Sequence, residues 1–313
     1  MNGLELSERF YLECVKPMLI EQFSDVLPQL AIGLFGSGSE CFGFDDAVST
    51  DHDFEPGVCI LLPDESVIDR QTAFRLERAY AKLPKEFLGY KRSNIAPVGG
   101  ARHGVLRTAE FFFDKVGAPD GVLTVQQWLT VPSHALFETI DGKLFYDGRG
   151  EVTAIRESLS RYPENIRKKK LAGHLLLMAQ AGQYNYRRCL AHGERGAAQL
   201  AITEFVRHTM TAVFLLNNVY EPYYKWSFRA MRALDRLPLL AETMEYLLTT
   251  DNEPELAETK YMMIEDAAAD VIDELVTQGL TKAICGDLEK HAYSVNDAIS
   301  DGEIRNLHVL AAV

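Results

Sequence analysis

Two patterns of apolar residues occur in the first half of the chain: short continuous runs and residues at helical spacing. Residues 31–35 and 58–62, AIGLF and VCILL, are short runs with the composition of buried strands. A further strand is expected near Val105. Apolar residues at helical spacing predict helices within 4–22 and 67–83. Strands that alternate with helices in this way predict a mixed α/β sheet, and the first helix is expected to cover one of its faces.

Capping and turn residues predict further elements between residues 108 and 147. Thr108 is the expected N-cap of a helix that ends at Gly117. Asp141-Gly142 stands between the apolar segments 135–140 and 143–147, and this dipeptide is typical of a tight hairpin turn because glycine accepts positive φ. We therefore predict two strands here, joined as a hairpin.

Helical periodicity dominates the rest of the chain. Beyond Arg149 no segment competes as a strand, and four prolines punctuate the pattern. The predicted fold is α+β, with a mixed α/β domain at residues 1–149 and a helical bundle domain at residues 150–313. The sequence contains no internal repeat.

A glycine-serine turn follows the first strand. Gly36, Ser37, Gly38 and Ser39 are small and turn-permissive, and a helix is expected to begin at Glu40. Backbone N–H groups at a helix N-terminus have no intrahelical partner, and the helix dipole favours negative charge there. The turn is therefore a candidate phosphate site; the alternative is a plain tight turn.

Two carboxylates precede the second strand. Asp51 and Asp53 flank His52, so an extended backbone sends both carboxylates to one face and the imidazole to the other. Hard oxygen ligands of this kind are what Mg²⁺ or Mn²⁺ takes together with substrate phosphates. Glu55, two residues after Asp53, is expected on the same face as the two aspartates. The alternative is that these residues are loop acids at a sheet edge.

The turn and the aspartate pair together resemble a known signature. Gly38-Ser39, a spacer and then Asp51-His52-Asp53 are similar to the motif of the polymerase-beta-like nucleotidyltransferase superfamily. This resemblance implies that the turn binds the β- and γ-phosphates of a nucleoside triphosphate and that the Asp pair binds Mg²⁺. A closer resemblance, to the bacterial family of domain of unknown function 4037, rests on the segments GSGSE, GFDD and STDHD.

The sequence departs from the superfamily pattern at one point. Active members usually carry a third carboxylate on a later strand, but the segment at 104–108 has none. Glu110, Glu55 and Asp46 are the candidates to replace it, although Glu110 is expected to start a helix. His103, expected in an exposed loop beside that strand, is a candidate proton acceptor.

The helical region holds a second group of candidates. The basic run 167–170 is either a solvated helix start or a triphosphate contact. The segments 183–188 and 222–226 are rich in tyrosine and resemble the same uncharacterised family. Tyr224 offers a stacking face and Lys225 a compact cation for a phosphate. The alternative is a buried network in which tyrosine hydroxyls and amides satisfy one another.

Composition limits the partners and the compartment. A formal charge of −13 over 313 residues argues against nucleic acid, which requires a basic footprint. Five cysteines without paired spacing, and no export signal or span of apolar residues, predict a cytoplasmic protein with no membrane partner. His174, His192 and His208 lack zinc-type spacing, so none is assigned to a metal.

Two functions remain after these observations. The first is Mg²⁺- or Mn²⁺-dependent transfer of a nucleoside monophosphate, AMP from ATP, to a hydroxyl group of an unidentified small molecule or protein. It resembles the antibiotic nucleotidyltransferases, whose partner domain is also helical and would orient the acceptor. The second is a catalytically impaired nucleotide-binding regulatory protein of the same fold, which the missing third carboxylate favours.

Overall fold

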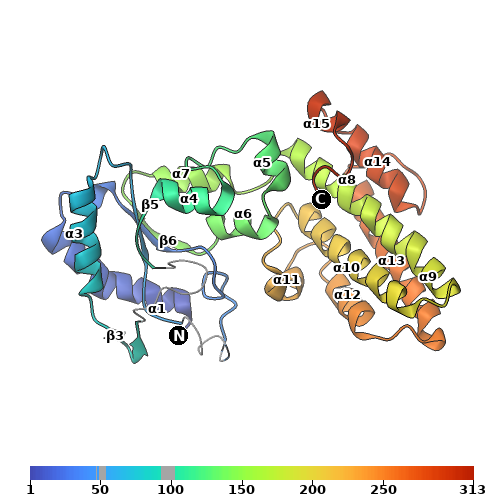
Figure 1. Ribbon diagram of the computed structural model, residues 1–313, viewed down its shortest axis with the longest axis horizontal. Helices are drawn as coiled ribbons and strands as arrows, with labels where there is room; N and C mark the ends of the chain where they lie inside the picture. The colour runs from blue at the N-terminus through green and yellow to red at the C-terminus, as the bar shows by residue number, and fades with distance from the viewer. Residues whose placement is uncertain (47, 49–53, 93–102) are drawn as a thin grey trace. The chain divides into compact units, whose positions relative to one another are not determined.

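The chain forms two compact units. In the computed structural model the described residues are 1–46, 48, 54–92 and 103–313 (Figure 1). The first unit comprises Met1–Leu123 and Ala135–Ser160, and the second comprises Thr124–His134 and Arg161–Val313. The sequence prediction placed a boundary after residue 149, before the helix Glu151–Ser158, which groups here with the first unit.

A four-stranded mixed sheet organises the first unit. Its order is β5-β2-β1-β6. β1 is antiparallel to both β2 and β6, whereas β2 and β5 are parallel. The strands are β1 (Ala31–Leu34), β2 (Cys59–Leu62), β5 (Gly104–Arg107) and β6 (Lys143–Asp147). A small second sheet pairs β3 (Glu86–Phe87) with β4 (Tyr90–Lys91). The prediction of a mixed sheet is confirmed.

The N-terminal helical segment covers one face of this sheet, as predicted. It runs continuously through α1 (Gly3–Phe10), one π-helical turn (Tyr11–Val15) and α2 (Lys16–Gln22). Phe10 and Val15 from this segment pack into one core with Ile32 of β1 and Ile60 of β2. Alternate residues of a strand lie on the same face of the sheet. The residues of β1 and β2 on this face therefore contact the apolar side of the N-terminal helical segment.

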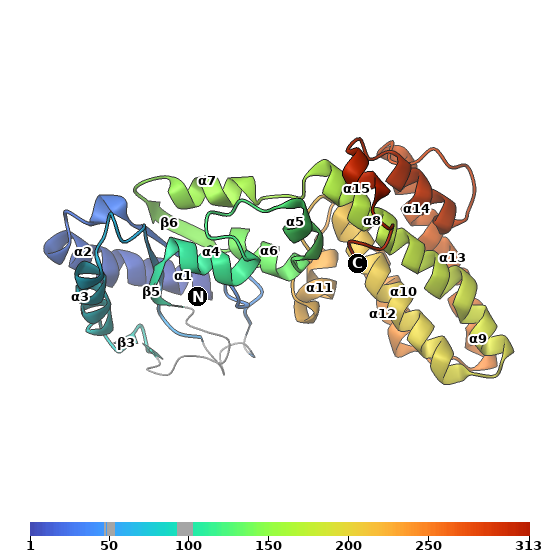
Figure 2. The same cartoon turned by 45° about the horizontal axis from the view of Figure 1, so that its top comes forward.

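The remaining helices of the first unit follow the strands. They are α3 (Arg70–Ala81), α4 (Thr108–Val116), α6 (Ser133–Ile140, from Ala135 onward in this unit) and α7 (Glu151–Ser158). Figure 2 shows α7 beside β6. A 3₁₀ turn, Leu27–Gln29, leads into β1.

Two details of the sequence prediction are corrected here. Arg107, not Thr108, is the N-cap of α4, although Gly117 ends that helix in the left-handed region as expected. The predicted hairpin at Asp141-Gly142 is wrong, because residues 133–140 form the helix α6 and only the following segment is a strand. Gly142 has φ of 73° and lies against the backbone of β1, so the dipeptide ends a helix instead of joining two strands.

The second unit is helical, as predicted. α8 packs against α10 and α14 (Figure 1). Its helices are α5 (Val125–Thr130), α8 (Glu164–Met178), a π-helical segment (Ala179–Tyr186), α9 (Arg187–Ala191), α10 (Arg195–Leu216), α11 (Tyr224–Met231), α12 (Leu240–Thr249), α13 (Pro254–Thr277), α14 (Leu288–Asp297) and α15 (Gly302–Asn306). Within the described part of the chain, no helix is both long and apolar enough to span a membrane.

In the basic run on α8, Arg167, Lys169 and Lys170 are buried and Lys168 is half-buried, which corrects the prediction of a solvated helix start. Lys169 is 0% exposed, and its Nζ donates to Asn296 Oδ1 at 2.8 Å and to the carbonyl of Leu307 at 2.6 Å. Lys170 Nζ donates to the carbonyl of Leu129 at 2.8 Å. Arg167 reaches a carbonyl of α10. Carbonyl groups from distant segments converge on this part of α8, and the basic side chains satisfy them.

Candidate functional site

The glycine-serine turn leaves the sheet at the end of β1. Gly36 and Gly38 have φ of 102° and 145°, a backbone conformation that other residues rarely adopt. A Cβ atom at Gly38 would collide with the carboxylate of Glu40. Backbone hydrogen bonds from Cys41 N to the carbonyl of Gly38 and from Phe44 N to that of Ser39 close the turn, at 3.1 and 2.9 Å.

No helix follows this turn, contrary to the prediction. Residues 39–43 form hydrogen-bonded turns, and Gly43 is again left-handed, with φ of 65°. Repeated positive φ angles are incompatible with a right-handed helix. The helix dipole therefore contributes nothing at Gly36, Ser37, Gly38 and Ser39, and any phosphate affinity of the turn depends on its own backbone and hydroxyl groups. Their phosphate role stays a prediction.

The aspartate pair lies outside the described residues. Asp51, His52 and Asp53 therefore have no geometry to report, and their metal role stays a prediction. Among the residues that the structure does describe, no group of three or more His, Cys, Asp or Glu side chains is arranged to hold a metal ion.

The candidates for a third carboxylate differ in position along the sheet. Glu110 accepts a hydrogen bond from Arg107 N and so caps α4, beyond the C-terminal end of β5. β1 is antiparallel to β2, and β2 is parallel to β5, so the turn after β1 and the start of β5 share the opposite edge. Glu110 is therefore on the wrong side for the turn. Asp46 is exposed and accepts a hydrogen bond from Val48 N.

Glu55 lies at the correct edge and is paired with His103. His103 Nδ1 is 3.2 Å from Glu55 Oε1, and the two side chains are 9% and 20% exposed. The prediction of an exposed loop histidine is thus wrong. Gly57 provides the space for the ring, because a Cβ there would lie 2.5 Å from His103 Cγ. Within the part of the chain that the structure describes, the buried Nε2 of His103 has no hydrogen-bond partner.

The sheet register brings this pair to the level of the turn. Gly33 is opposite Cys59, which is opposite Gly104, and Gly104 N donates to the carbonyl of Val58 at 2.9 Å. Neighbouring strands are about 4.8 Å apart, so the backbone at His103 is about two strand spacings, or about 10 Å, from that at the end of β1. A phosphorylated ligand of ordinary size spans such a distance.

The candidates of the second unit have different surroundings. Tyr224 is 75% exposed and its ring lies 4.5 Å from that of Tyr223. Lys225 is exposed, with Nζ 5.1 Å from the centroid of the Trp226 ring. Both candidates belong to the second unit and the turn to the first, so their role beside the turn stays a prediction.

Part of the aromatic and amide group is structural, in agreement with the alternative interpretation. Tyr186 is fully buried, and its hydroxyl donates to Asn252 Oδ1 at 3.0 Å. Asn217 donates to and accepts from the backbone of Arg236. Gln183 donates to the Glu265 carboxylate at 2.8 Å. These groups join helices of the second unit to one another.

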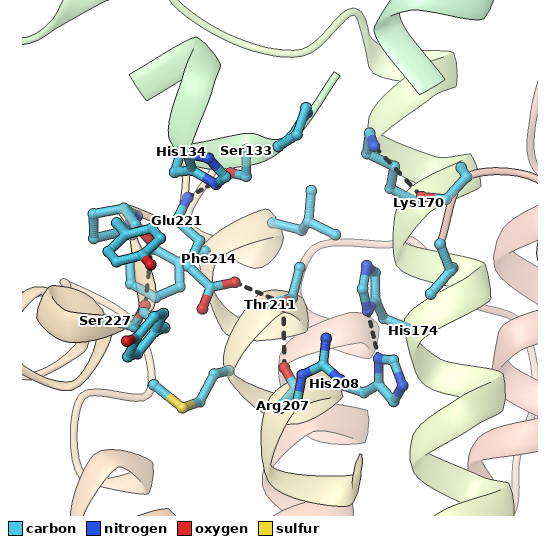
Figure 3. Close-up of a pocket in the computed structure, with 18 of the residues that line it drawn as sticks. Ser133, His134, Lys170, His174, Arg207, His208, Thr211, Phe214, Glu221 and Ser227 are labelled. Carbon is cyan, nitrogen blue, oxygen red and sulfur yellow. Dashed lines mark hydrogen bonds between the residues drawn. The ribbon is translucent and has the colours of Figure 1, made fainter. Parts of the chain in front are cut away.

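A cavity of about 750 Å³ lies within the second unit. Sequence reasoning missed it, because its walls come from segments up to about 180 residues apart, between Leu129 and Val313. Figure 3 shows His174 of α8 facing His208 of α10, and their Nδ1 atoms are 3.0 Å apart. His208 Nε2 is 3.4 Å from Glu204 Oε2. This volume is in the usual range for sites of small molecules.

Burial shifts the pKa values of several ionisable groups that face this cavity. Desolvation lowers the pKa of Lys170 to about 8. Desolvation, followed by the charge of His208, holds the pKa of His174 well below its usual value. Desolvation raises the pKa of Glu221, although hydrogen bonds from Thr211 and Ser227 oppose this shift. The cavity therefore combines an apolar wall with several ionisable groups.

Comparison with known proteins gives a match to one family model and a distant likeness to solved structures. Residues 128–227 match the model of the family described as Domain of unknown function (DUF4037), which confirms the resemblance for these residues. The match covers about a third of the chain and includes Tyr224 and Lys225. It also includes most of the residues that line the cavity.

The other comparisons add little. No curated protein matches the chain. Among solved structures, a nucleotidyltransferase-like protein from Exiguobacterium sibiricum is similar, with 12% identity and a TM-score of 0.40 over 92% of this chain and 81% of the other.

Proposed function

We propose that the first unit transfers a nucleoside monophosphate, AMP from ATP, to a hydroxyl group of a small molecule or a protein in a Mg²⁺- or Mn²⁺-dependent reaction. One observation carries the proposal. The left-handed glycine-serine turn and the His103–Glu55 pair lie at one edge of the sheet, and Asp51 and Asp53 immediately precede this edge in sequence.

The turn would bind the triphosphate. Gly36 and Gly38 carry no side chain over the backbone, so a phosphate can approach the N–H groups closely. The hydroxyl groups of Ser37 and Ser39 are further donors. Asp51 and Asp53 would hold the metal ion, whose bound charge would neutralise the phosphate oxygens. Two aspartates separated by one residue are a donor set of the hard oxygens that Mg²⁺ takes.

His103 would be the base that this site otherwise lacks. If Nδ1–H donates to Glu55, Nε2 keeps its lone pair and can accept a proton. The acceptor's oxygen attacks the α-phosphorus and forms the new P–O bond, while the bond to the β-phosphate oxygen breaks and pyrophosphate leaves. The proton of the attacking hydroxyl passes to His103 Nε2. Glu55 fixes the tautomer and stabilises the resulting imidazolium.

The residues of the second unit would assist by positioning. Lys225 is proposed for this role as a cation that suits a phosphate and Tyr224 as an aromatic face that suits stacking, on their chemistry alone. Bringing reactants into line provides much of the acceleration in phosphoryl transfer.

The experiment compares transfer by matched carboxylate variants. The protein is incubated with each of the four nucleoside triphosphates, labelled at the α-phosphate, with Mg²⁺ or Mn²⁺ and a panel of hydroxyl acceptors, and pyrophosphate release is followed. Asp51→Asn and Asp53→Asn should abolish label transfer. Asp114→Asn changes an exposed aspartate on α4 and should leave transfer unchanged.

The second candidate function is nucleotide binding without turnover. The observation that favours it is the side chain of Arg107, on the strand where a third carboxylate is usual, which donates to the carbonyls of Pro63 and Ile68 at 2.7 and 2.9 Å. The side chain at position 107 therefore holds backbone carbonyl groups and does not serve as a metal ligand. Metal-dependent nucleotide binding that Asp51→Asn removes, with no pyrophosphate release from any acceptor, would favour this regulatory function over transfer.

A further inference from the structure

Two groups of opposite charge, the buried Lys170 and the half-buried Glu221, line the cavity of the second unit without pairing with each other. Figure 3 shows Glu221 and Lys170 on opposite sides of this cavity. Lys170 Nζ donates to the carbonyls of Leu129 and Ala312, and among the described residues no carboxylate pairs with it. Glu221 accepts a hydrogen bond from Thr211 Oγ1 at 2.6 Å, and no cation of the described chain pairs with it.

Both charges are partly desolvated, and an unpaired desolvated charge is costly because neutral hydrogen bonds offset the loss of hydration only in part. Arg207 also lines the cavity, and its charge lowers the pKa of Glu221 slightly against the larger effect of desolvation, but its exposed side chain pairs with Glu204 at 3.4 Å. A ligand with a positive and a negative group would compensate Glu221 and Lys170 together. We propose that this cavity binds a small zwitterion, in which an ammonium group faces Glu221 and a carboxylate group faces Lys170 across an apolar body.

The walls of the cavity suit such a body. On the Glu221 side, the rings of His134 and Tyr223 have centroids 5.6 Å apart, and Tyr224 follows at 4.5 Å from Tyr223. Aromatic faces attract an ammonium group and its adjacent methylene groups. Phe214 also lines the cavity, beside Glu221 in Figure 3, and offers an apolar surface to the body of the ligand.

Hydrogen bonds on the Glu221 side also favour a donor from the ligand. Thr211 Oγ1 lies between the Glu221 carboxylate and the carbonyl of Arg207, and its single proton serves only one of them at a time. The backbone N–H of Glu221 donates to Ser133 Oγ at 2.7 Å. The carboxylate is therefore held in place by its neighbours but keeps acceptor capacity for an ammonium group.

Probes of increasing length test this inference directly. Aminobutyrate, aminohexanoate and aminooctanoate carry the two charges at increasing separation, while hexylamine and hexanoate carry one charge each. Isothermal titration should show that the best amino acid of the series binds at least about tenfold more tightly than either singly charged compound. Equal affinity for hexylamine or hexanoate, or no binding by any member of the series, would overturn the proposal.

Variants assign the ammonium end. Glu221→Gln keeps an oxygen acceptor for Thr211 and should lower affinity for the amino acid by about 30-fold, while affinity for hexanoate is unchanged. Glu242→Gln removes an exposed partner of Arg232 outside the cavity and is the matched control. Unchanged amino acid affinity in Glu221→Gln would contradict the assignment.

Variants of Lys170 assign the carboxylate end. Lys170→Met should lower affinity for the amino acid and for hexanoate, and leave that for hexylamine unchanged. Because Lys170 also satisfies two carbonyls, Lys170→Arg is measured in parallel, with melting curves for both. Arginine keeps the charge and should keep a preference for the zwitterion; loss of that preference in a folded Lys170→Arg variant would count against the proposal. These results are independent of nucleotide transfer, since they require neither metal nor nucleotide.

Discussion

The two units each contain a part-buried pair that includes histidine, and the partner of the histidine differs between them. In the first unit His103 Nδ1 faces the Glu55 carboxylate at 3.2 Å. In the second unit His174 Nδ1 faces His208 Nδ1 at 3.0 Å. A carboxylate accepts a hydrogen bond from either protonation state of the ring, whereas two facing Nδ1 atoms form a hydrogen bond only when one of them lacks a proton.

This difference in the partner affects whether each histidine pair can accept a proton. In the proposed reaction His103 Nε2 would accept the proton of the attacking hydroxyl, with Nδ1 held by the Glu55 carboxylate. The pKa of His174 is held well below its usual value, first by desolvation and then by the charge of His208, so this pair stays neutral near pH 7. The first pair is suited to proton transfer, and the second is suited to a neutral wall of a cavity.

The largest expected effect concerns the first pair. His103→Asn removes the proton acceptor and should lower the rate of nucleotide transfer by about 10²- to 10⁴-fold, with little change in nucleotide affinity. His192→Asn, an exposed substitution on the other unit, is the control. Initial rates of pyrophosphate release measure the effect, and a full rate in His103→Asn would break the comparison.

The next effect tests the space that holds His103. Gly57→Ala places a Cβ 2.5 Å from His103 Cγ, so the ring or the backbone that precedes β2 must move. We expect a loss of about 1–3 kcal/mol in the free energy of unfolding, as for other overpacked sites, and a slower transfer rate. In a His103→Ala background the same substitution should cost much less, because the clash is absent. Equal costs in both backgrounds, measured by denaturant unfolding, would show that the ring does not occupy this space.

A smaller effect is expected from acid on the second pair. The pKa values of His174 and His208 are both lowered, chiefly by desolvation. Below about pH 6.5 the unfolded chain therefore binds more protons than the folded chain, so the free energy of unfolding falls as the pH falls. Melting curves between about pH 7 and pH 5 should show this decline, and His174→Asn combined with His208→Gln should flatten it. An unchanged slope in the double variant would contradict the assignment.

The smallest expected effect concerns Glu204. Its carboxylate is 3.4 Å from His208 Nε2, half exposed, and its charge raises the pKa of His208 against the larger effect of burial. Glu204→Gln should change the free energy of unfolding at pH 7 by about 0–1 kcal/mol. It should also make the loss of stability in acid slightly steeper, since the folded pKa of His208 falls further. Melting curves with and without added salt measure both results.

Local patterns in the sequence predicted much of the fold. The runs at 31–35 and 58–62 are apolar at every position, as a strand buried on both faces requires, and both contain strands of the sheet. Apolar periodicity also located the first helices, and Gly117 marked the end of α4. The hairpin at Asp141-Gly142 failed because the preceding segment has apolar residues compatible with both periods, and tertiary packing selected the helix.

The sites depend on contacts that no local pattern contains. Glu55 and His103 are 48 residues apart, and only the parallel pairing of β2 with β5 brings them together. His174 and His208 are 34 residues apart on two helices. Lys169 is indistinguishable in sequence from a solvated lysine, because its acceptors come from the end of the chain. The turn at Gly36–Ser39 was found because glycine itself signals positive φ.

The central claim, nucleotide transfer at the sheet edge of the first unit, is tested most directly by the fate of an α-phosphate label. The protein is incubated with ATP labelled at the α-phosphate, Mg²⁺ and the acceptor panel, and wild type, Asp51→Asn, His103→Asn and Asp114→Asn are compared. The proposal predicts covalent label on an acceptor in wild type and Asp114→Asn, none in Asp51→Asn, and a rate about 10²- to 10⁴-fold lower in His103→Asn. Label transfer that persists in Asp51→Asn, or ATP binding by wild type with no transfer, would contradict it.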